Sequence, residues 1–134
     1  MKVWPTHYPD KCPPDHSESV SGNIYRFTNR INPRYRDFSS YYELNPGHDW
    51  GNKACDARGL SVYRTEEDCI AAAAVVPALK KKHIAKASLL PGCGVIAPTH
   101  SNNTKNHNTF WSLISTEKLA SLFFPALLAS DTNV

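Results

Sequence analysis

Apolar and polar residues alternate in several short stretches of this chain, and this alternation predicts β-strands. Residues 23–28 and 83–89 have the clearest two-residue period, while residues 94–97 and 109–114 are short and rich in apolar or aromatic side chains. Residues 60–63 add a central strand that follows a glycine. Glycine, proline and small polar residues separate the stretches, so we expect mainly antiparallel pairing.

The strongest helix signal follows the central strand. Thr65 and Asp68 are spaced as in a capping box, which supplies acceptors to the first free amides of a helix. The alanines at 71–74 favour helix, and Pro77 ends it. The sequence therefore predicts an α+β fold, with a small, mainly antiparallel sheet that carries one principal helix.

Two weaker helices are also predicted. One covers residues 38–44, with Asp37 as its cap. The other is capped by Thr116 and runs through Phe124, where Pro125 bends or ends it. We therefore divide the chain into an irregular N-terminal lead-in (1–22), one α+β domain (23–115) and a C-terminal helix and tail (116–134).

Composition narrows the range of functions only slightly. A chain of 134 residues forms one domain, and its formal net charge of +3 permits an anionic ligand without requiring nucleic acid. The start of the chain lacks an apolar run of signal-peptide length, and the apolar segment 119–129 is too short to span a bilayer. We expect a cytoplasmic protein without a membrane partner.

Four cysteines are scattered singly along the chain. Their spacing does not match a structural zinc site, so we expect no metal. In a reducing cytoplasm all four would be free thiols, with Cys69 inert in the core and Cys55 the more reactive.

Arg26 is the most informative candidate functional residue. It lies in the middle of the first predicted strand, where burial of a cation is costly unless an anion meets it. One interpretation is an anionic ligand. The other is a structural ion pair with Asp37 or Glu43 at the edge of the sheet.

Much of the chain resembles a group of short, uncharacterised bacterial proteins. Their shared run is a YR strand, an F-S-x-x-x-E-L-x-P segment, C-x-A-x-G-L-S-V and a terminal S-H-H-T-W-W. The corresponding residues here are 25–26, 38–46, 55–62 and 106–111. His107 matches the first histidine of the last motif, and Asn108 replaces the second. The resemblance implies no particular activity.

A second resemblance is to the ADP-ribosyltransferase fold, in which a serine-bearing strand leads directly into a helix. Residues 61–68 with Ala71 are similar to the S-T-T-R-x-x-x-x-A segment of that fold. The resemblance implies NAD or a nucleotide as ligand. Arg26 would bind a phosphate, Ser61 would contact a ribose, and Tyr63 or Trp111 would stack on a base.

The chain departs from that pattern in its acidic residues. Such transferases use a late glutamate, whereas Glu117 is the only acidic residue between positions 83 and 130 and lies in a predicted helix. Relatives that remove a phosphate from RNA use arginines and a histidine instead. His83, His100 or His107 would supply that histidine, which leaves a nucleotide or RNA end as a candidate substrate. The candidate catalytic set is Arg26, Ser61 and His107.

Each candidate also has a structural interpretation. Ser61 is a small strand residue that backbone groups would satisfy, and His107 is a loop histidine that would bond a carbonyl. Trp111 is more often a core residue than a ligand contact. These alternatives stay open at the level of sequence.

Two further functions come from other features. Arginines alternate with tyrosines between positions 30 and 42, as in single-stranded nucleic-acid binders; they are Arg30, Arg34, Tyr35, Arg36, Tyr41 and Tyr42. The loop-rich ends are equally compatible with a non-catalytic protein-interaction factor, of accessory or immunity type.

Overall fold

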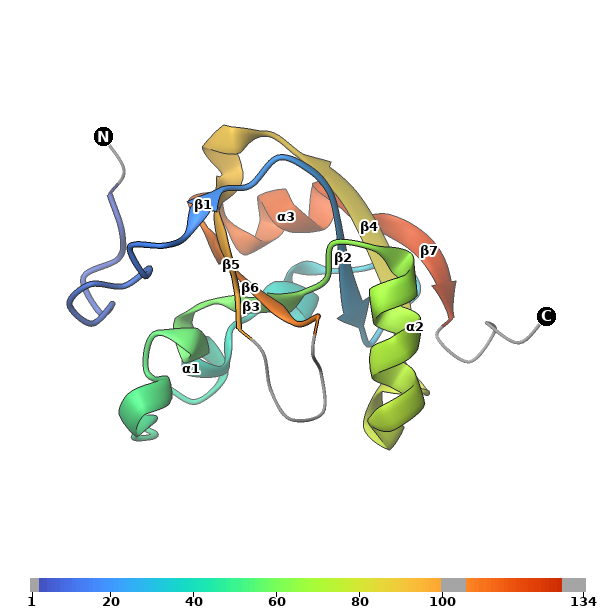
Figure 1. Ribbon diagram of the computed structural model, residues 1–134, viewed down its shortest axis with the longest axis horizontal. Helices are drawn as coiled ribbons and strands as arrows, with labels where there is room; N and C mark the ends of the chain where they lie inside the picture. Colours follow the sequence, from blue (N-terminus) through green and yellow to red (C-terminus); the bar gives the residue numbers. More distant parts are fainter. Residues whose placement is uncertain (1–2, 100–105, 129–134) are drawn as a thin grey trace.

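The chain folds into two antiparallel sheets and three α-helices, as seen in the computed structural model, which describes residues 3–99 and 106–128. The strands are β1 (Glu18–Ser19), β2 (Gly22–Thr28), β3 (Leu60–Val62), β4 (His83–Leu89), β5 (Gly94–Pro98), β6 (Asn108–Ser112) and β7 (Phe124–Leu128). The helices are α1 (Tyr41–Leu44), α2 (Glu66–Val75) and α3 (Thr116–Leu122). The α+β class is thus confirmed (Figure 1).

The strands form two sheets where a single one was expected. One sheet has the order β1-β5-β6-β3 and the other β2-β4-β7, and every pairing is antiparallel. In the described part of the chain one bridge joins them: Tyr25 and Tyr63 exchange two backbone hydrogen bonds of 2.8 Å. Because Arg26 follows Tyr25 and Ser61 lies near Tyr63, this bridge brings the two sequence-predicted site residues close together.

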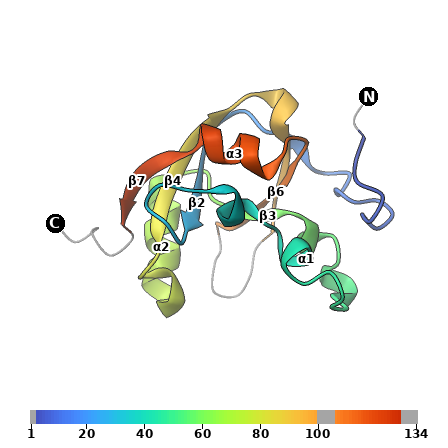
Figure 2. The same cartoon turned by 180° about the vertical axis from the view of Figure 1, so that it is seen from behind.

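The sheet β2-β4-β7 is covered on both faces, because the side chains of a strand point alternately to its two sides. Ile24 and Ala85 pack into the main core together with Val62 of the other sheet, and α3 covers that core (Figure 2). The opposite face, with Ile84, packs against Cys69 and neighbouring residues of α2. Arg26 has the same parity as Ile24, and so it points to the core side of the sheet.

Helix α2 begins at the predicted cap Thr65, but only the Thr65 half of the predicted capping box is formed, and the Asp68 carboxylate accepts from the Asn106 side chain at 2.8 Å. The Thr65 side chain accepts a hydrogen bond from the Asp68 amide at 3.1 Å, which satisfies one free amide of the first turn. The helix ends at Val75, and Pro77 starts the 3₁₀ turn η4 (Pro77–Leu79).

The prediction for residues 38–44 is wrong in detail. A 3₁₀ turn, η1 (Tyr35–Phe38), precedes the short α1, and the N-cap of α1 is Ser40. Asp37 caps neither helix as an N-cap residue, because its carboxylate lies inside η1 and accepts from the amides of Asn29 and Arg34. The Asp37 carboxylate therefore satisfies amides of its own loop, and Ser40 caps the next helix instead.

The C-terminal segment is more ordered than predicted. Helix α3 is present as predicted, but its N-cap is Ser115, one residue before the predicted cap Thr116, and it ends at Leu122. Residues 124–128, which were predicted as the helix end and tail, form β7 beside β4. Residues beyond 128 lie outside the described part, as does the candidate His100. No helix among the described residues is long and apolar enough to cross a membrane.

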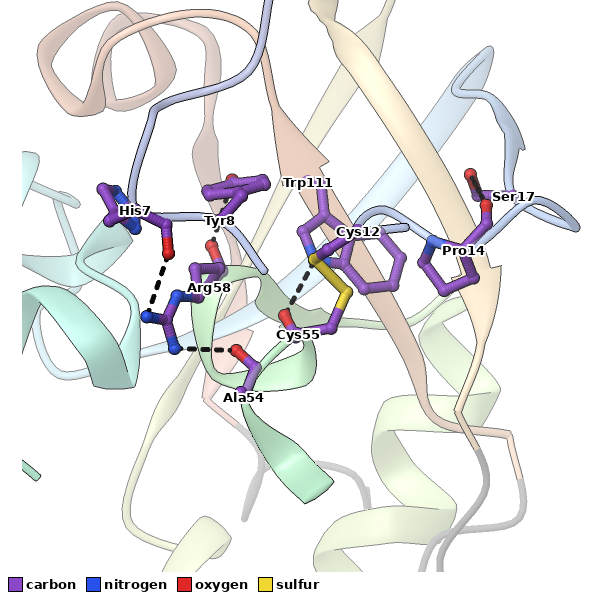
Figure 3. The surroundings of a disulfide bond; sticks show 9 residues. All are labelled: His7, Tyr8, Cys12, Pro14, Ser17, Ala54, Cys55, Arg58 and Trp111. Atoms are coloured by element: carbon purple, nitrogen blue, oxygen red, sulfur yellow. Dashed lines mark hydrogen bonds between the residues drawn. A yellow bond between two sulfur atoms is a disulfide. The ribbon is translucent and has the colours of Figure 1, made fainter. Parts of the chain in front are cut away.

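The expectation of four free thiols is also wrong. Cys12 and Cys55, which are 43 positions apart, form a disulfide, and the Cys55 carbonyl accepts a hydrogen bond from the Trp111 indole at 2.9 Å (Figure 3). Cys55 is therefore not the reactive thiol. Cys69 is buried, and burial raises the pKa of its thiol, as expected for an inert core residue.

Candidate functional site

Arg26 lies at the end of the core beside a cavity. Its Nε donates to the Asp37 carbonyl at 2.9 Å and its Nη1 donates to the Ser61 carbonyl at 2.7 Å. Its Cζ atom lies 5.9 Å from the centre of the Phe38 ring. Within the described ranges no carboxylate forms an ion pair with Arg26. The predicted structural pair with Asp37 or Glu43 is thus replaced by two backbone carbonyls.

Desolvation determines the electrostatics of Arg26. Burial lowers the pKa of its guanidinium to about 10, and Tyr41 and Asp37 oppose part of that change. Arg26 is therefore still charged at neutral pH, but its charge is poorly solvated. Arg26 is half-buried, and a cation in this state gains more than a fully exposed one from contact with an anion.

Ser61 is held between Leu60 and Val62, which are both buried in the core, and so its side chain points to the other face of β3. Its Oγ lies 2.8 Å from Nε2 of His107. His107 comes directly before β6, and β3 pairs with β6 in the register Ser61↔Thr109. This pairing brings the serine and the histidine together from positions 46 apart in the sequence.

The tautomer of His107 follows from its other ring nitrogen. Nδ1 lies 2.9 Å from the Thr99 carbonyl oxygen, which can only accept, so we assign the proton to Nδ1. Nε2 then accepts from the Ser61 hydroxyl. The Thr99 hydroxyl, which is also 2.9 Å from Nδ1, lies 2.7 Å from the Thr109 hydroxyl and fixes the orientation of this network.

Tyr63 completes the neighbourhood. Its ring meets the His107 ring edge-on, with centroids 5.8 Å apart and planes at 84°. Only 3% of the residue is exposed, and burial raises the pKa of its phenol to about 12. Tyr63 is therefore neutral at all ordinary pH values and offers a ligand little ring surface.

The cavity beside Arg26 has a volume of about 310 Å³. Parts of β2, β3, η1, α1 and η4 line it, so the α1 segment stands on one side and the end of α2 on the other (Figure 1). Arg26, Ser61 and Tyr63 are lining residues. His107 is not, but it contacts the cavity indirectly, through the hydroxyl of Ser61.

Positive charge dominates the wall of this cavity. Arg36 and Lys82 line it together with Arg26, and Asp37 is the one acidic residue among the lining residues that the structure describes. The Asp37 carboxylate, however, accepts from two backbone amides and pairs with Arg30 at 3.3 Å. An anion in the cavity would therefore meet three cations and one carboxylate that is already engaged.

Some of these residues were not found from the sequence. Lys82 was not among the candidates, yet its Nζ donates to the Asn29 side-chain oxygen at 3.0 Å on the cavity wall. Arg36 and Tyr41 were assigned to a separate basic and aromatic cluster. No sequence signal joins these positions. The pairing of β2 with β4 brings Lys82 beside Asn29, and the bond from Arg26 to the Asp37 carbonyl holds the η1 segment against the same cavity.

Trp111 does not belong to this site. It is fully buried, and it packs near the disulfide with Val95 and Ala97 (Figure 3). Its indole N–H is used by the Cys55 carbonyl. It cannot stack on a ligand in this structure, which agrees with the interpretation of Trp111 as a core residue.

A second cavity, of about 300 Å³, lies on the other side of Ser40. Arg58 lines it together with Glu43, Glu117 and apolar residues of the core. Arg58 lies over the Tyr42 ring at 4.0 Å and donates to the carbonyls of Ala54 and His7. Within the described ranges, no group of three or more histidine, cysteine or acidic residues is placed to hold a metal ion.

Comparison of this chain with protein-family models, with curated proteins and with solved structures found no match.

Proposed function

We propose that the cavity beside Arg26 binds the phosphate of a nucleotide, and that the protein is an enzyme with an ADP-ribosyltransferase-like fold. Its substrate would be NAD or the phosphate-bearing end of a nucleotide or RNA. One observation carries the proposal: Arg26 bonds the Ser61 carbonyl at 2.7 Å, and the Ser61 hydroxyl bonds His107 at 2.8 Å, beside a single cavity.

The charge of the cavity supports a phosphate ligand. A guanidinium presents several donors in one plane, which matches the oxygens of a phosphate. Arg26 uses two donors on carbonyls that fix its position, and Arg36 and Lys82 add positive charge to the wall. Such a preorganised arrangement favours an anion without a large rearrangement of the protein.

The serine and histidine supply a group that can hold or move a proton. With Nδ1–H held by the Thr99 carbonyl, Nε2 of His107 is oriented toward the Ser61 hydroxyl. A substrate hydroxyl near Ser61 could pass its proton to the same nitrogen through that serine. This is the geometry expected of a general base within hydrogen-bond reach.

The positions of the acidic residues favour the phosphate-bearing end of a nucleotide or RNA over NAD as the substrate. Transfer from NAD in this fold would need a carboxylate at the ribose, and Asp37, the single acidic lining residue, is occupied by two amides. Glu117 lines the second cavity instead. Cations with a histidine suit a phosphate at a nucleotide or RNA end better than they suit the glycosidic bond of NAD.

A cytoplasmic location stays a prediction, and the Cys12–Cys55 bridge weighs against it, because disulfides are rare in reducing compartments. The redox state of these two cysteines in host lysate prepared with a thiol-blocking reagent tests this location. If the reagent modifies Cys12 and Cys55 as two free thiols, the result supports a cytoplasmic location; if the two are recovered as a disulfide, the result contradicts it.

Thermal unfolding of the full chain with ADP, adenosine monophosphate and NAD tests the proposed function. A ligand at about 100 times its Kd stabilises the folded state by about 2.7 kcal/mol, which raises Tm by several degrees. Arg26→Ala should abolish this rise. The matched control is Lys86→Ala, which removes an exposed cation from the neighbouring strand β4.

Circular dichroism must first show that the Arg26→Ala protein is folded, and Arg26→Lys serves if it is not. The lysine keeps the charge but loses the planar fork, so the rise in Tm should shrink. If none of the three ligands raises Tm for the unaltered chain, or if Arg26 variants respond as fully as Lys86→Ala, the proposed function is wrong.

A further inference from the structure

Four ring-bearing side chains lie on the surface that extends from the Arg26 cavity, and we call Tyr35, Tyr41, His48 and Trp50 the aromatic rim. Tyr41 is 61% exposed and lines the cavity itself. Its ring centroid is 5.9 Å from that of Trp50, which in turn is 4.3 Å from that of His48. The rim therefore extends from the cavity outward over residues 41–50, on the α1 side in Figure 1.

Tyr35 continues the rim toward the arginines. It is 48% exposed, and the Arg36 guanidinium lies 5.9 Å from its ring centre while Nε donates to the Tyr35 hydroxyl. Arg36 is itself a lining residue of the cavity, and Arg34 nearby is exposed. Rings and cations thus alternate at the surface next to a positively charged cavity.

The carboxylates closest in sequence to the rim are already engaged. Glu43 accepts from the Ser40 amide at 2.9 Å, and Asp49 accepts from the Gly51 amide at 2.9 Å. They act as local caps and turn residues. Arg34 and Arg36, which flank Tyr35, are exposed instead and are available to a phosphate backbone.

We propose that the substrate is the end of a single-stranded nucleic acid, whose terminal phosphorylated nucleotide enters the cavity while the next bases stack on the aromatic rim. This inference rests on the proposed function and adds its substrate class. Exposed rings interleaved with arginines bind single strands because every base has a face for stacking and every link has a phosphate charge. A protein partner would instead be expected to meet an apolar centre with a polar border. Here Arg34 and Arg36 flank the Tyr35 end of the rim, and Arg36 also lines the cavity.

Isothermal titration of the full chain tests the inference. The probes are adenosine monophosphate and hexaadenylate RNA with a phosphate at its 5′ or its 3′ end. Stacking of one base on one aromatic ring tightens binding about 5- to 150-fold. We therefore expect at least one of the two hexamers to bind more than about 10-fold tighter than the mononucleotide.

Two variants separate the rim from the cavity. Tyr35→Ala and Trp50→Ala change residues that do not line the cavity, and each should weaken hexamer binding by at least about 5-fold while mononucleotide binding is kept. Phe124→Ala is the matched control, because it removes a 66% exposed ring from β7. Arg36→Gln should in addition make hexamer binding less dependent on salt.

The outcomes distinguish the two proposals. If the mononucleotide binds but neither hexamer binds tighter, or if the rim variants behave like Phe124→Ala, the nucleic-acid inference is overturned and the proposed function stands. If the mononucleotide and both hexamers fail to bind, both are overturned. A hexamer that binds tightly through Tyr35 and Trp50 supports the inference.

Discussion

Arg26 and Arg58 are bonded in a similar way and yet lie in opposite surroundings. Each donates to two backbone carbonyls, and each contacts an aromatic ring. Arg26 borders a cavity with two further cations, whereas Arg58 borders one with two glutamates and lies directly over Tyr42. Hydrogen bonds fix both side chains, and the charge of the neighbours separates a candidate ligand contact from a structural one.

The Arg58 side also carries the disulfide, which ties residues near the start of the chain to the loop before β3 (Figure 3). The lead-in packs there through Trp4 and Tyr8, against Trp111. The cavity beside Arg26 has no such covalent support. Its wall depends on strand pairing and on the short turns between residues 35 and 44.

Removal of the disulfide should have the largest effect on stability. The bridge closes a loop across a separation of 43 residues, and in the chain-entropy model its loss costs about 4 kcal/mol of unfolding free energy. Urea unfolding of Cys12→Ser measures this loss, with Cys93→Ser as the control that leaves the bridge intact. A change below about 1 kcal/mol would mean that the bridge does not constrain the unfolded chain.

Nucleotide binding should survive the same change. The cavity beside Arg26 shares no lining residue with the bridge, so Cys12→Ser should keep its response to ADP at a temperature where it is folded. A loss of the response in the folded variant would show that the two regions are coupled.

Exchange of each arginine for methionine should have the next largest effect. We expect the Arg58 variant to lose stability and the Arg26 variant to lose nucleotide affinity. Arg58→Met should lower the unfolding free energy by about 2 kcal/mol, because the ring contact and two charged hydrogen bonds are lost, without changing nucleotide affinity. Arg26→Met should weaken ADP binding by about 10-fold or more. Paired urea unfolding and calorimetry measure both quantities, and equal losses of affinity in the two variants would contradict the comparison.

The smallest expected effect is a change in tyrosine titration. Burial raises the pKa of both Tyr63 and Tyr8 to about 12, one in each region. Each phenol ionises near pH 10 in the unfolded chain, so the stability that it contributes below pH 10 is lost as pH rises toward 12. A pH titration followed by absorbance at about 295 nm, where ionised tyrosine absorbs, should show one tyrosine fewer ionising near pH 12 in Tyr63→Phe, and likewise one fewer in Tyr8→Phe. A variant that loses a group near pH 10 instead would contradict the burial of that ring.

The sequence predicted a strand or helix correctly where the residues that specify it lie within that element. β4 covers the predicted residues 83–89 because strict alternation marks a strand whatever its partner, and Thr65 caps α2 because its acceptor lies within one turn. Residues 124–128 were missed as a strand. Pro125 suggested a break, but among the described strands β7 pairs with β4 alone, so a residue without an amide hydrogen is accommodated at this edge.

The candidate site was predicted in part. Arg26 stood out because a cation in a strand needs a partner, and Ser61 and His107 entered through a resemblance to known proteins. The hydrogen bond between Ser61 and His107 could not be derived, since it depends on the register of β3 against β6. The partners of Arg26 were missed because they are backbone carbonyls, which every residue has and no side-chain pattern reveals.

Sequence alone thus determined the strand and helix positions that alternation, caps and prolines specify, together with the choice of Arg26 as a residue to explain. The tertiary structure alone decided the split into two sheets, the Cys12–Cys55 pairing and the set of charges around each arginine. The physical reason is the range of the interactions: propensities and caps act within a few residues, whereas pairing and cavity charge depend on contacts between segments that are 35 or more positions apart.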